Sequence, residues 1–205
     1  MNAMTALKIA TQTHHSLLEA NPHMHKLMGD RLTHTDYVSL LSRMYGFYVP
    51  LETCLSQFEP IWQQCGIDFN QRRKVPLLEQ DLLASGLTPD ALRQLPHCTS
   101  IPLVQSFPQA VGVLYVLEGA TLGGQMISRH IALQLGLRLE REVAFFSSYR
   151  SETGAMWKQL AVQINSYVET AFSHTDMATM ILSAQATFQT LDDWLGSNRL
   201  TRIAV

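Results

Sequence analysis

Cysteine and charge are both scarce in this 205-residue chain, which has three cysteines and only 16% charged residues. Cys54, Cys65 and Cys98 lie far apart, so they form neither a Cys-x-x-Cys pair nor a zinc-ligand spacing. A formal net charge of −2 provides no overall basic field, which disfavours nucleic acid and anionic membranes as partners. Because 46% of the residues are hydrophobic, the composition excludes intrinsic disorder and favours a buried core.

Long apolar runs are also absent. The longest run, residues 110–117, ends at Glu118 and is far shorter than the roughly 20 residues that cross a bilayer. The N-terminal segment lacks the apolar core of a signal peptide. We therefore expect a soluble, cytoplasmic protein whose cysteines are ordinary thiols in a reducing compartment.

Strand signals are few, since alternating patterns are scarce and neither Asn-Gly nor Asp-Gly occurs. Helical periodicity dominates, and Thr33 with Asp36 predicts a capping box, while Pro50 predicts a bend in a long helix. The predicted helical segments are 5–20, 36–64, 70–84, 88–95, 109–137, 151–172 and 176–195. The sequence thus predicts one all-α domain over residues 1–205, built from seven or eight helices.

The first segment carries adjacent histidines. A predicted buried stripe of this helix consists of Leu7, Ala10, Thr11, His14, Leu17 and Leu18. His15 lies on the neighbouring face together with Glu19, four residues on, as a metal-binding pair or an acid–base pair would. Burial alone would choose His14 as a ligand, and an ordinary surface or core histidine is the alternative for each of the eight histidines.

A run of small residues, 119–124, interrupts the later segment 109–137. Each glycine inside a helix costs roughly 1 kcal/mol relative to alanine, so some other interaction must compensate. Either a second helix packs closely on the small residues, or a flat ligand lies against bare backbone. A phosphate-binding loop is disfavoured, because no Gly-Lys-Ser/Thr follows.

Two motifs, in the expected order, carry a resemblance to a known family. LKIATQTHHSLLE (7–19) resembles the first helix of heme oxygenases, which has the pattern Leu-Lys-x-x-Thr-x-x-x-His-x-x-x-Glu. LYVLEGATLGGQMISRHI (114–131) resembles their distal helix, in the form found in the bacterial branch associated with bacteriophytochromes. RKVPLLEQDL (73–82), FFSSY (145–149) and WK (157–158) follow the same branch, so the resemblance spans nearly the whole chain.

The resemblance implies a multi-helix bundle with heme sandwiched between the first and distal helices. It assigns His15 as the axial heme iron ligand and Gly119 and Gly123 as the catalytic distal glycines, and it leaves His14 in a packing position. The residues that it implies for heme binding are Lys8, Thr11, His15, Leu18, Glu19, Tyr115, Gly119, Thr121, Gly123, Lys158 and Phe188.

Three positions depart from the family pattern. Ala120 stands where many members have an aspartate, which puts the route of proton delivery in doubt and leaves Thr121 and backbone groups to hold distal water. Val162 replaces a basic residue one turn beyond Lys158, and the propionate-side tyrosine is shifted by one position to Tyr115. Both of these changes bear on how the propionates are anchored.

The activity that the resemblance implies is oxidative cleavage of heme to biliverdin, carbon monoxide and ferrous iron. Such a reaction uses O2 and electrons from a ferredoxin or flavodoxin reductase system, and a bacteriophytochrome is a candidate acceptor of the biliverdin. One alternative is a heme-binding or sensing protein that lost turnover. Others are a thiaminase-like or di-iron relative, disfavoured by the lack of a Glu-x-x-His motif, and a purely structural bundle.

Overall fold

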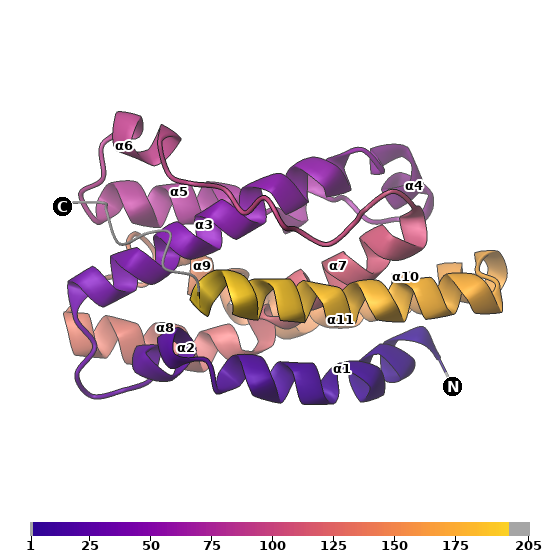
Figure 1. Cartoon of the computed structure of the whole chain (residues 1–205), viewed down its shortest axis with the longest axis horizontal. Coiled ribbons are helices and arrows are strands. Elements are labelled where there is room, and N and C mark those ends of the chain that lie inside the picture. Colours follow the sequence, from indigo (N-terminus) through magenta and orange to yellow (C-terminus); the bar gives the residue numbers. More distant parts are fainter. Residues whose placement is uncertain (1, 197–205) are drawn as a thin grey trace.

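The computed structural model describes residues 2–196, and all regular secondary structure in that range is helical (Figure 1). The α-helices are α1 (Ala3–Glu19), α2 (Pro22–Leu27), α3 (His34–Ser56), α4 (Glu59–Gln64), α5 (Val75–Ala84), α6 (Pro89–Arg93), α7 (Phe107–Gly119), α8 (Thr121–Leu135), α9 (Ala144–Ser147), α10 (Thr153–Ala171) and α11 (His174–Gly196). Two 3₁₀ turns, η1 (Asn70–Arg72) and η2 (Arg150–Glu152), precede α5 and α10. The all-α, single-domain prediction is confirmed, although short helices raise the number above the predicted seven or eight.

The long helix α3 begins as predicted but ends differently. The Thr33 side chain accepts from the Asp36 backbone and the Asp36 side chain accepts from the Thr33 backbone, which completes the capping box. Pro50 lies inside α3, and the helix continues to Ser56. The Gly46 carbonyl, which would accept from an amide at position 50, instead accepts from the Cys98 amide at 2.9 Å. The predicted segment 36–64 is therefore split after Ser56 into α3 and α4.

The core lies around α7 and α11. α11 packs against α7, α1 and α3, and Figure 1 shows it between α3 on one side of the bundle and α1 on the other. Gly112 lets the two central helices approach closely, because a Cβ there would collide with the Met180 carbonyl oxygen on α11. α3 packs in turn on α5, and α9 joins α5 to α8.

The continuous segment Phe107–Leu135 is long and apolar enough, by length and composition, to cross a membrane. In this fold the segment is broken at Ala120 into α7 and α8, and 56% of its most apolar window is buried within the protein. α7 is enclosed by α11, α3 and α10. Its hydrophobicity is thus that of a core helix.

The predicted stripe on α1 is only partly correct. Leu7 and Thr11 are buried, whereas Leu17 is 59% exposed, so the prediction was wrong for Leu17. The N-terminal half of α1 is tied down where the Asn165 side chain accepts from the Met4 amide and the Gln185 side chain donates to the Ala10 carbonyl. A further tie follows the helix, where the Asn21 side chain donates to Asp192 of α11 at 2.7 Å, so the last turns of α1 expose only their outward face to solvent.

Candidate active site

The imidazole of His15 projects from α1 into solvent-accessible space, with 56% of its side chain exposed. Its Nδ1 lies 3.5 Å from Glu19 Oε2, one helical turn on, and its ring meets Phe188 of α11 in a T-shaped contact with centroids 5.8 Å apart. A carboxylate beside Nδ1 favours a proton on that nitrogen. Nε2 is then the nitrogen that is free to bind a ligand.

His14 occupies a different environment on the same helix. It is half-buried, and its Nδ1 is enclosed without a hydrogen-bond partner in the part of the chain that the structure describes. Adjacent helical residues point about 100° apart, so the two histidines face different surroundings. This placement matches the packing position expected of His14 and leaves His15 as the accessible imidazole.

Tyr115 of α7 lies beside the buried Thr11 of α1. The Thr11 hydroxyl donates to the Leu7 carbonyl at 2.8 Å within its own helix, and the Tyr115 ring lies 5.7 Å from that of Trp157 of α10. Burial raises the pKa of Tyr115, and the contact with Thr11 partly offsets that rise. Tyr115 is thus a half-buried residue of α7 that packs on Trp157.

The glycines of the α7–α8 segment fall into two groups. A Cβ at Gly123 would meet only Ile127 at 3.8 Å, and one at Gly119 would meet only the Trp157 ring, at 3.7 Å or more. A Cβ at Gly124, by contrast, would collide with the Phe146 carbonyl oxygen of α9. The close-packing explanation is thus correct for Gly124, while Gly119 and Gly123 present open backbone, for which the flat-ligand explanation stays a prediction.

Large apolar side chains beside the open glycines are accessible to solvent. Leu122 is 48% exposed and Met126 is 73% exposed, and both flank Gly123 on α8. On α10, Val162 is 66% exposed one turn after the exposed Lys158. Exposed apolar groups next to bare backbone suit a flat apolar ligand better than they suit water.

The remaining predicted residues are distributed around this surface. Lys8 is exposed on α1, Leu18 is partly buried, and Phe188 is buried against His15. Thr121 is buried, and its hydroxyl donates to the Glu118 carbonyl at 2.7 Å, so its hydrogen is committed to the helix rather than to a ligand. Ala120 is exposed at the break between α7 and α8.

Sequence reasoning missed a buried cluster beneath the break. Glu118, the residue before Gly119, is bound by Arg72, Lys74 and Tyr149 in the interior. The available signal was a lone carboxylate at the end of the most apolar run of the chain, since an unpaired charge is hardly ever buried. Its partners come from segments far apart in sequence, so spacing could not identify them.

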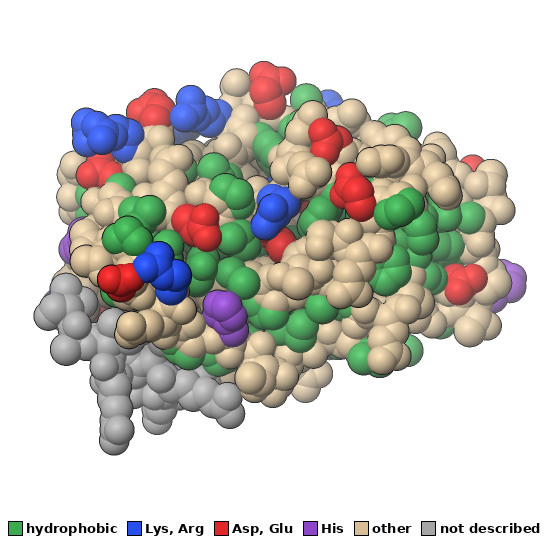
Figure 2. All heavy atoms as spheres, turned by 90° about the horizontal axis from the view of Figure 1, so that it is seen from above, with side chains coloured by type: hydrophobic (Ala, Val, Ile, Leu, Met, Phe, Trp, Pro, Cys, Tyr) green, Lys and Arg blue, Asp and Glu red, His purple; other side chains and the backbone are tan. Residues whose placement is uncertain are grey.

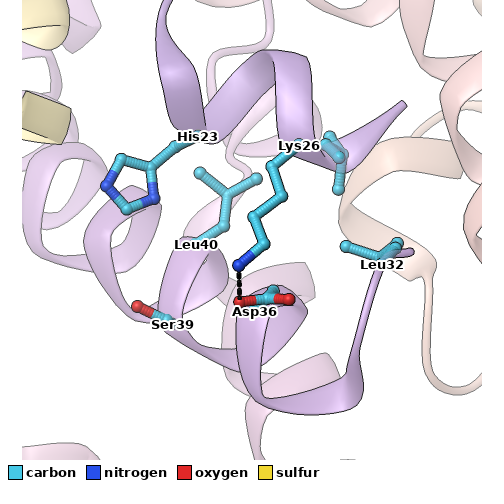
Figure 3. A pocket seen from close by; sticks show the side chains of 7 residues that line it. His23, Lys26, Leu32, Asp36, Ser39 and Leu40 are labelled. Carbon is cyan, nitrogen blue, oxygen red and sulfur yellow. Dashed lines mark hydrogen bonds and ion pairs between the residues drawn. The ribbon is translucent and has the colours of Figure 1, made fainter. Parts of the chain in front are cut away.

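Two hollows lie away from these residues. A small one of about 70 Å³ between α2 and α3 is lined by residues that include His23, Lys26, Asp36 and Leu40 (Figure 3). The Lys26 ammonium donates to Asp36 across its floor. A volume of this size is below the roughly 300–1,000 Å³ of small-molecule sites. The second, a shallow groove of about 330 Å³, is formed by the segment before α7 and one side of α11.

Surface charge is mixed on the side of the molecule seen in Figure 2. Acidic and basic side chains alternate there with hydrophobic ones, and the described part of this face shows no continuous basic patch. Such a distribution lacks the electrostatic footprint of a nucleic-acid-binding face.

The structure defines the class as an all-α bundle with an accessible histidine on its first helix, and comparison with known proteins identifies the family. The heme oxygenase family profile matches residues 1–196. A heme oxygenase of Xanthomonas campestris is 29% identical over 153 residues, which are 74% of this chain and 84% of that protein. The chain therefore belongs to the heme oxygenase family, a family of heme-degrading enzymes.

Solved structures show the same fold. The heme oxygenase of Leptospira interrogans superimposes with a TM-score of 0.77 at 17% identity, over 95% of this chain and 98% of that chain. Heme oxygenase-1 of the cyanobacterium Synechocystis, solved in complex with heme, has a TM-score of 0.77 at 16% identity, over 95% and 91% of the two chains. The enzyme of Neisseria meningitidis has a TM-score of 0.76 at 17% identity, over 95% and 90%.

Proposed function

We propose that this protein is a heme oxygenase that binds heme between α1 and the α7–α8 break and cleaves it oxidatively. The observation that carries the proposal is that this member of the heme oxygenase family has an accessible imidazole at His15 and, on another helix pair, side-chain-free backbone at Gly119 and Gly123. The donor set fits heme: a neutral imidazole, an apolar surface, and no Cβ where a porphyrin face would lie. When bound, heme is the substrate and also supplies the iron at which O2 is reduced.

His15 binds the iron through Nε2 in this proposal, and two neighbours fix its orientation. The Glu19 carboxylate lies 3.5 Å from Nδ1, which favours a proton on that nitrogen and leaves Nε2 for the iron. Phe188 holds the ring plane through the edge-to-face contact. A neutral imidazole ligand, unlike a thiolate, does not push electron density toward O–O cleavage.

Gly119 and Gly123 let the backbone of α7 and α8 lie against the opposite face. Their lack of side chains leaves space for a small ligand such as O2, and the backbone that lies close to that ligand would tilt it toward one edge of the ring. Leu122 and Met126 would exclude bulk water from the same side. Tyr115, half-buried against Trp157, and the buried Thr11 are proposed to line the inner edge of the ring.

Lys8 and Lys158 are the cations proposed for the propionates. Both are exposed, so each can meet a carboxylate at the solvent edge of the ring at little desolvation cost. Val162 cannot take the charged role that the family pattern gives its position. We expect correspondingly weaker anchoring at that edge.

The proposed products are biliverdin, carbon monoxide and ferrous iron. Electrons are assigned to a ferredoxin or flavodoxin reductase system in the cytoplasm, with a bacteriophytochrome as the candidate acceptor of biliverdin. These assignments follow from the family resemblance and the bacterial form of the distal motif. Docking and turnover assays with each donor would test them.

A heme sensor on the same fold is the competing function, and Ala120 is the observation that favours it, because the position has no carboxylate to direct protons. The test is to load the protein with hemin and add a reductase–ferredoxin couple in air. Loss of the Soret band with release of a bilin supports the enzyme. A stable reduced or oxygenated complex without bilin supports the sensor.

A further inference from the structure

The inward side of the α7–α8 break is held by buried ions. The Glu118 side chain is only 1% exposed and accepts from Arg72 Nη1 and Lys74 Nζ, each at 2.5 Å. The Tyr149 hydroxyl donates to the same carboxylate at 2.7 Å and accepts from Lys74 Nζ at 2.8 Å. Removing these charges from water costs several kcal/mol per ion, and the pairs offset that cost only in one well-ordered arrangement.

Lys74 is itself fixed by a second buried carboxylate. Glu52 of α3 accepts from the backbone amides of Lys74 and Val75, at 2.5 and 3.1 Å, and from Arg73 Nε at 3.1 Å. Burial raises the pKa of Glu52, whereas these three donors lower it. The ammonium of Lys74 therefore reaches Glu118 from an anchored stretch of backbone.

Tyr149 is presented by a strained segment. The residues on either side of it, Ser148 and Arg150, are non-glycine residues with positive φ, at 41° and 53°. Each such residue costs roughly 1–3 kcal/mol and persists only where the surroundings determine it. Strain on both sides of a buried hydroxyl indicates that the position of Tyr149 is specified closely.

The same segment touches the first turns of α8. The Phe146 carbonyl oxygen fills the space that a Cβ at Gly124 would need, and the Gln125 side chain donates to the Arg150 carbonyl at 2.6 Å. On the α10 side, Arg72 also reaches the Met156 carbonyl, next to Trp157, whose ring borders Gly119. The network thus connects the end of α7, the start of α8 and the start of α10.

We propose that Glu118, Lys74 and Tyr149 are positioning residues, which fix the α7–α8 break and so hold the Gly119–Gly123 backbone at the height that a bound ring and its gaseous ligand require. None of the three is proposed to touch heme. The buried ion pairs of the network stabilise the distal backbone from the interior of the protein. The distal backbone itself has no carboxylate at Ala120. The catalytic part of this inference rests on the proposed function. The rigidity of the α7–α8 break that it predicts is a property of the heme-free protein.

The first test uses the protein without heme. Tyr149→Phe removes one hydroxyl and leaves Glu118 paired with Arg72 and Lys74, so the variant should fold. Amide hydrogen exchange across 119–127 should become about tenfold faster, because a hydrogen bond to a buried charge is lost. Tyr45→Phe is the matched control, since its hydroxyl donates to Glu79 at 3.4 Å, outside the network. In the control, exchange across 119–127 should stay unchanged.

The second test uses the hemin-loaded protein. Tyr149→Phe should keep hemin affinity and KM near the wild-type values, while kcat for bilin formation falls by about tenfold through misplacement of the distal backbone. The C–O stretching band of the ferrous carbonyl complex should shift or broaden in Tyr149→Phe and stay unchanged in Tyr45→Phe. Glu118→Gln, which leaves Arg72 and Lys74 uncompensated, should give larger changes in the same directions.

The outcomes separate the two proposals. If wild-type protein neither binds nor degrades hemin, the proposed function fails, whatever the exchange data show. If Tyr149→Phe lowers the melting temperature but leaves local exchange, the C–O band and kcat unchanged, the network is merely structural and the positioning inference is overturned. Faster exchange confined to 119–127, together with an altered C–O band, would establish it.

Discussion

The imidazole of His15 and the ring of Phe188 meet edge to face, with centroids 5.8 Å apart and planes inclined at 74°. The contact joins α1 to α11, helices that pack together although they stand at opposite ends of the chain. Because Phe188 is buried and His15 is exposed, the fixed ring orients the accessible one. The orientation of His15, the proposed iron ligand, therefore depends on the tertiary fold as well as on the sequence of α1.

Replacing the two histidines of α1 in turn should distinguish the ligand from its neighbour. His15→Ala should abolish the imidazole signature of the ferric heme spectrum and the bilin yield, because the neighbouring His14 points about 100° away on the same helix. His14→Ala should keep both and cost about 1 kcal/mol or less of stability, since the removed ring is only half-buried. Spectra and yields that follow the opposite pattern would transfer the assignment to His14.

Alanine substitutions at two adjacent glycines should change stability in opposite directions. Gly123→Ala should stabilise the heme-free protein by about 0.5–1 kcal/mol, because Gly123 is helical and a Cβ there meets only Ile127, at 3.8 Å. Gly124→Ala should destabilise it by about 1–3 kcal/mol, since the new methyl group collides with the Phe146 carbonyl. Urea denaturation measures both, and equal effects at the two positions would contradict the division of the glycines.

A bulky residue at Gly123 tests whether the backbone there faces the heme-bound ligand or a packed side chain. Gly123→Leu should block carbon monoxide binding to the ferrous heme complex while the heme-free protein keeps most of its stability. Carbon monoxide titration and thermal melting provide the two readouts. Unchanged carbon monoxide affinity with a large fall in melting temperature would mean that Gly123 is a packing residue.

Asp81 should give a pH dependence of stability opposite to that of most carboxylates. It is fully buried and accepts from the Ala144 and Phe145 amides at the start of α9, and burial raises its pKa from 3.8 to about 6. A raised folded-state pKa means that the folded protein holds the proton more tightly. The contribution of this group to stability is therefore full below about pH 4 and is lost as the pH rises through 6.

The effect of Asp81 is isolated by comparison with Asp81→Asn. The difference in unfolding free energy, wild type minus variant, should fall by an amount on the order of 1–3 kcal/mol between pH 4 and pH 7. Subtracting the variant removes the contributions of the other carboxylates. A difference that rises with pH would show that the two amide hydrogen bonds outweigh the burial of the charge.

Much of the site could be predicted from the sequence where the relevant residues share one helix. His15 and Glu19 are four residues apart, and helical geometry alone places them together. The glycine run likewise exposes backbone within a single segment, although only the fold shows that Gly124 packs on α9 while Gly123 does not. Local periodicity also predicted the all-α class and the Thr33 capping box.

Features that depend on several segments could not be predicted in this way. Glu118 meets Arg72, Lys74 and Tyr149 across sequence separations of 31 to 46 residues, and no local pattern encodes such pairing. The passage of α3 through Pro50 depends on a hydrogen bond from the Cys98 amide to the Gly46 carbonyl. Leu17 is exposed because it lies ten residues after the buried Leu7, about 80° around the helix and at the edge of the predicted stripe.

The most direct test of the proposed function is product analysis of the hemin-loaded wild-type protein, given O2 and a reductase–ferredoxin couple. The account predicts that the Soret band decays, that carbon monoxide is released, and that a bilin with the mass of biliverdin accumulates in proportion to the heme consumed. A ferrous or oxygenated complex that persists without bilin, or heme loss that is abolished by catalase, would contradict it.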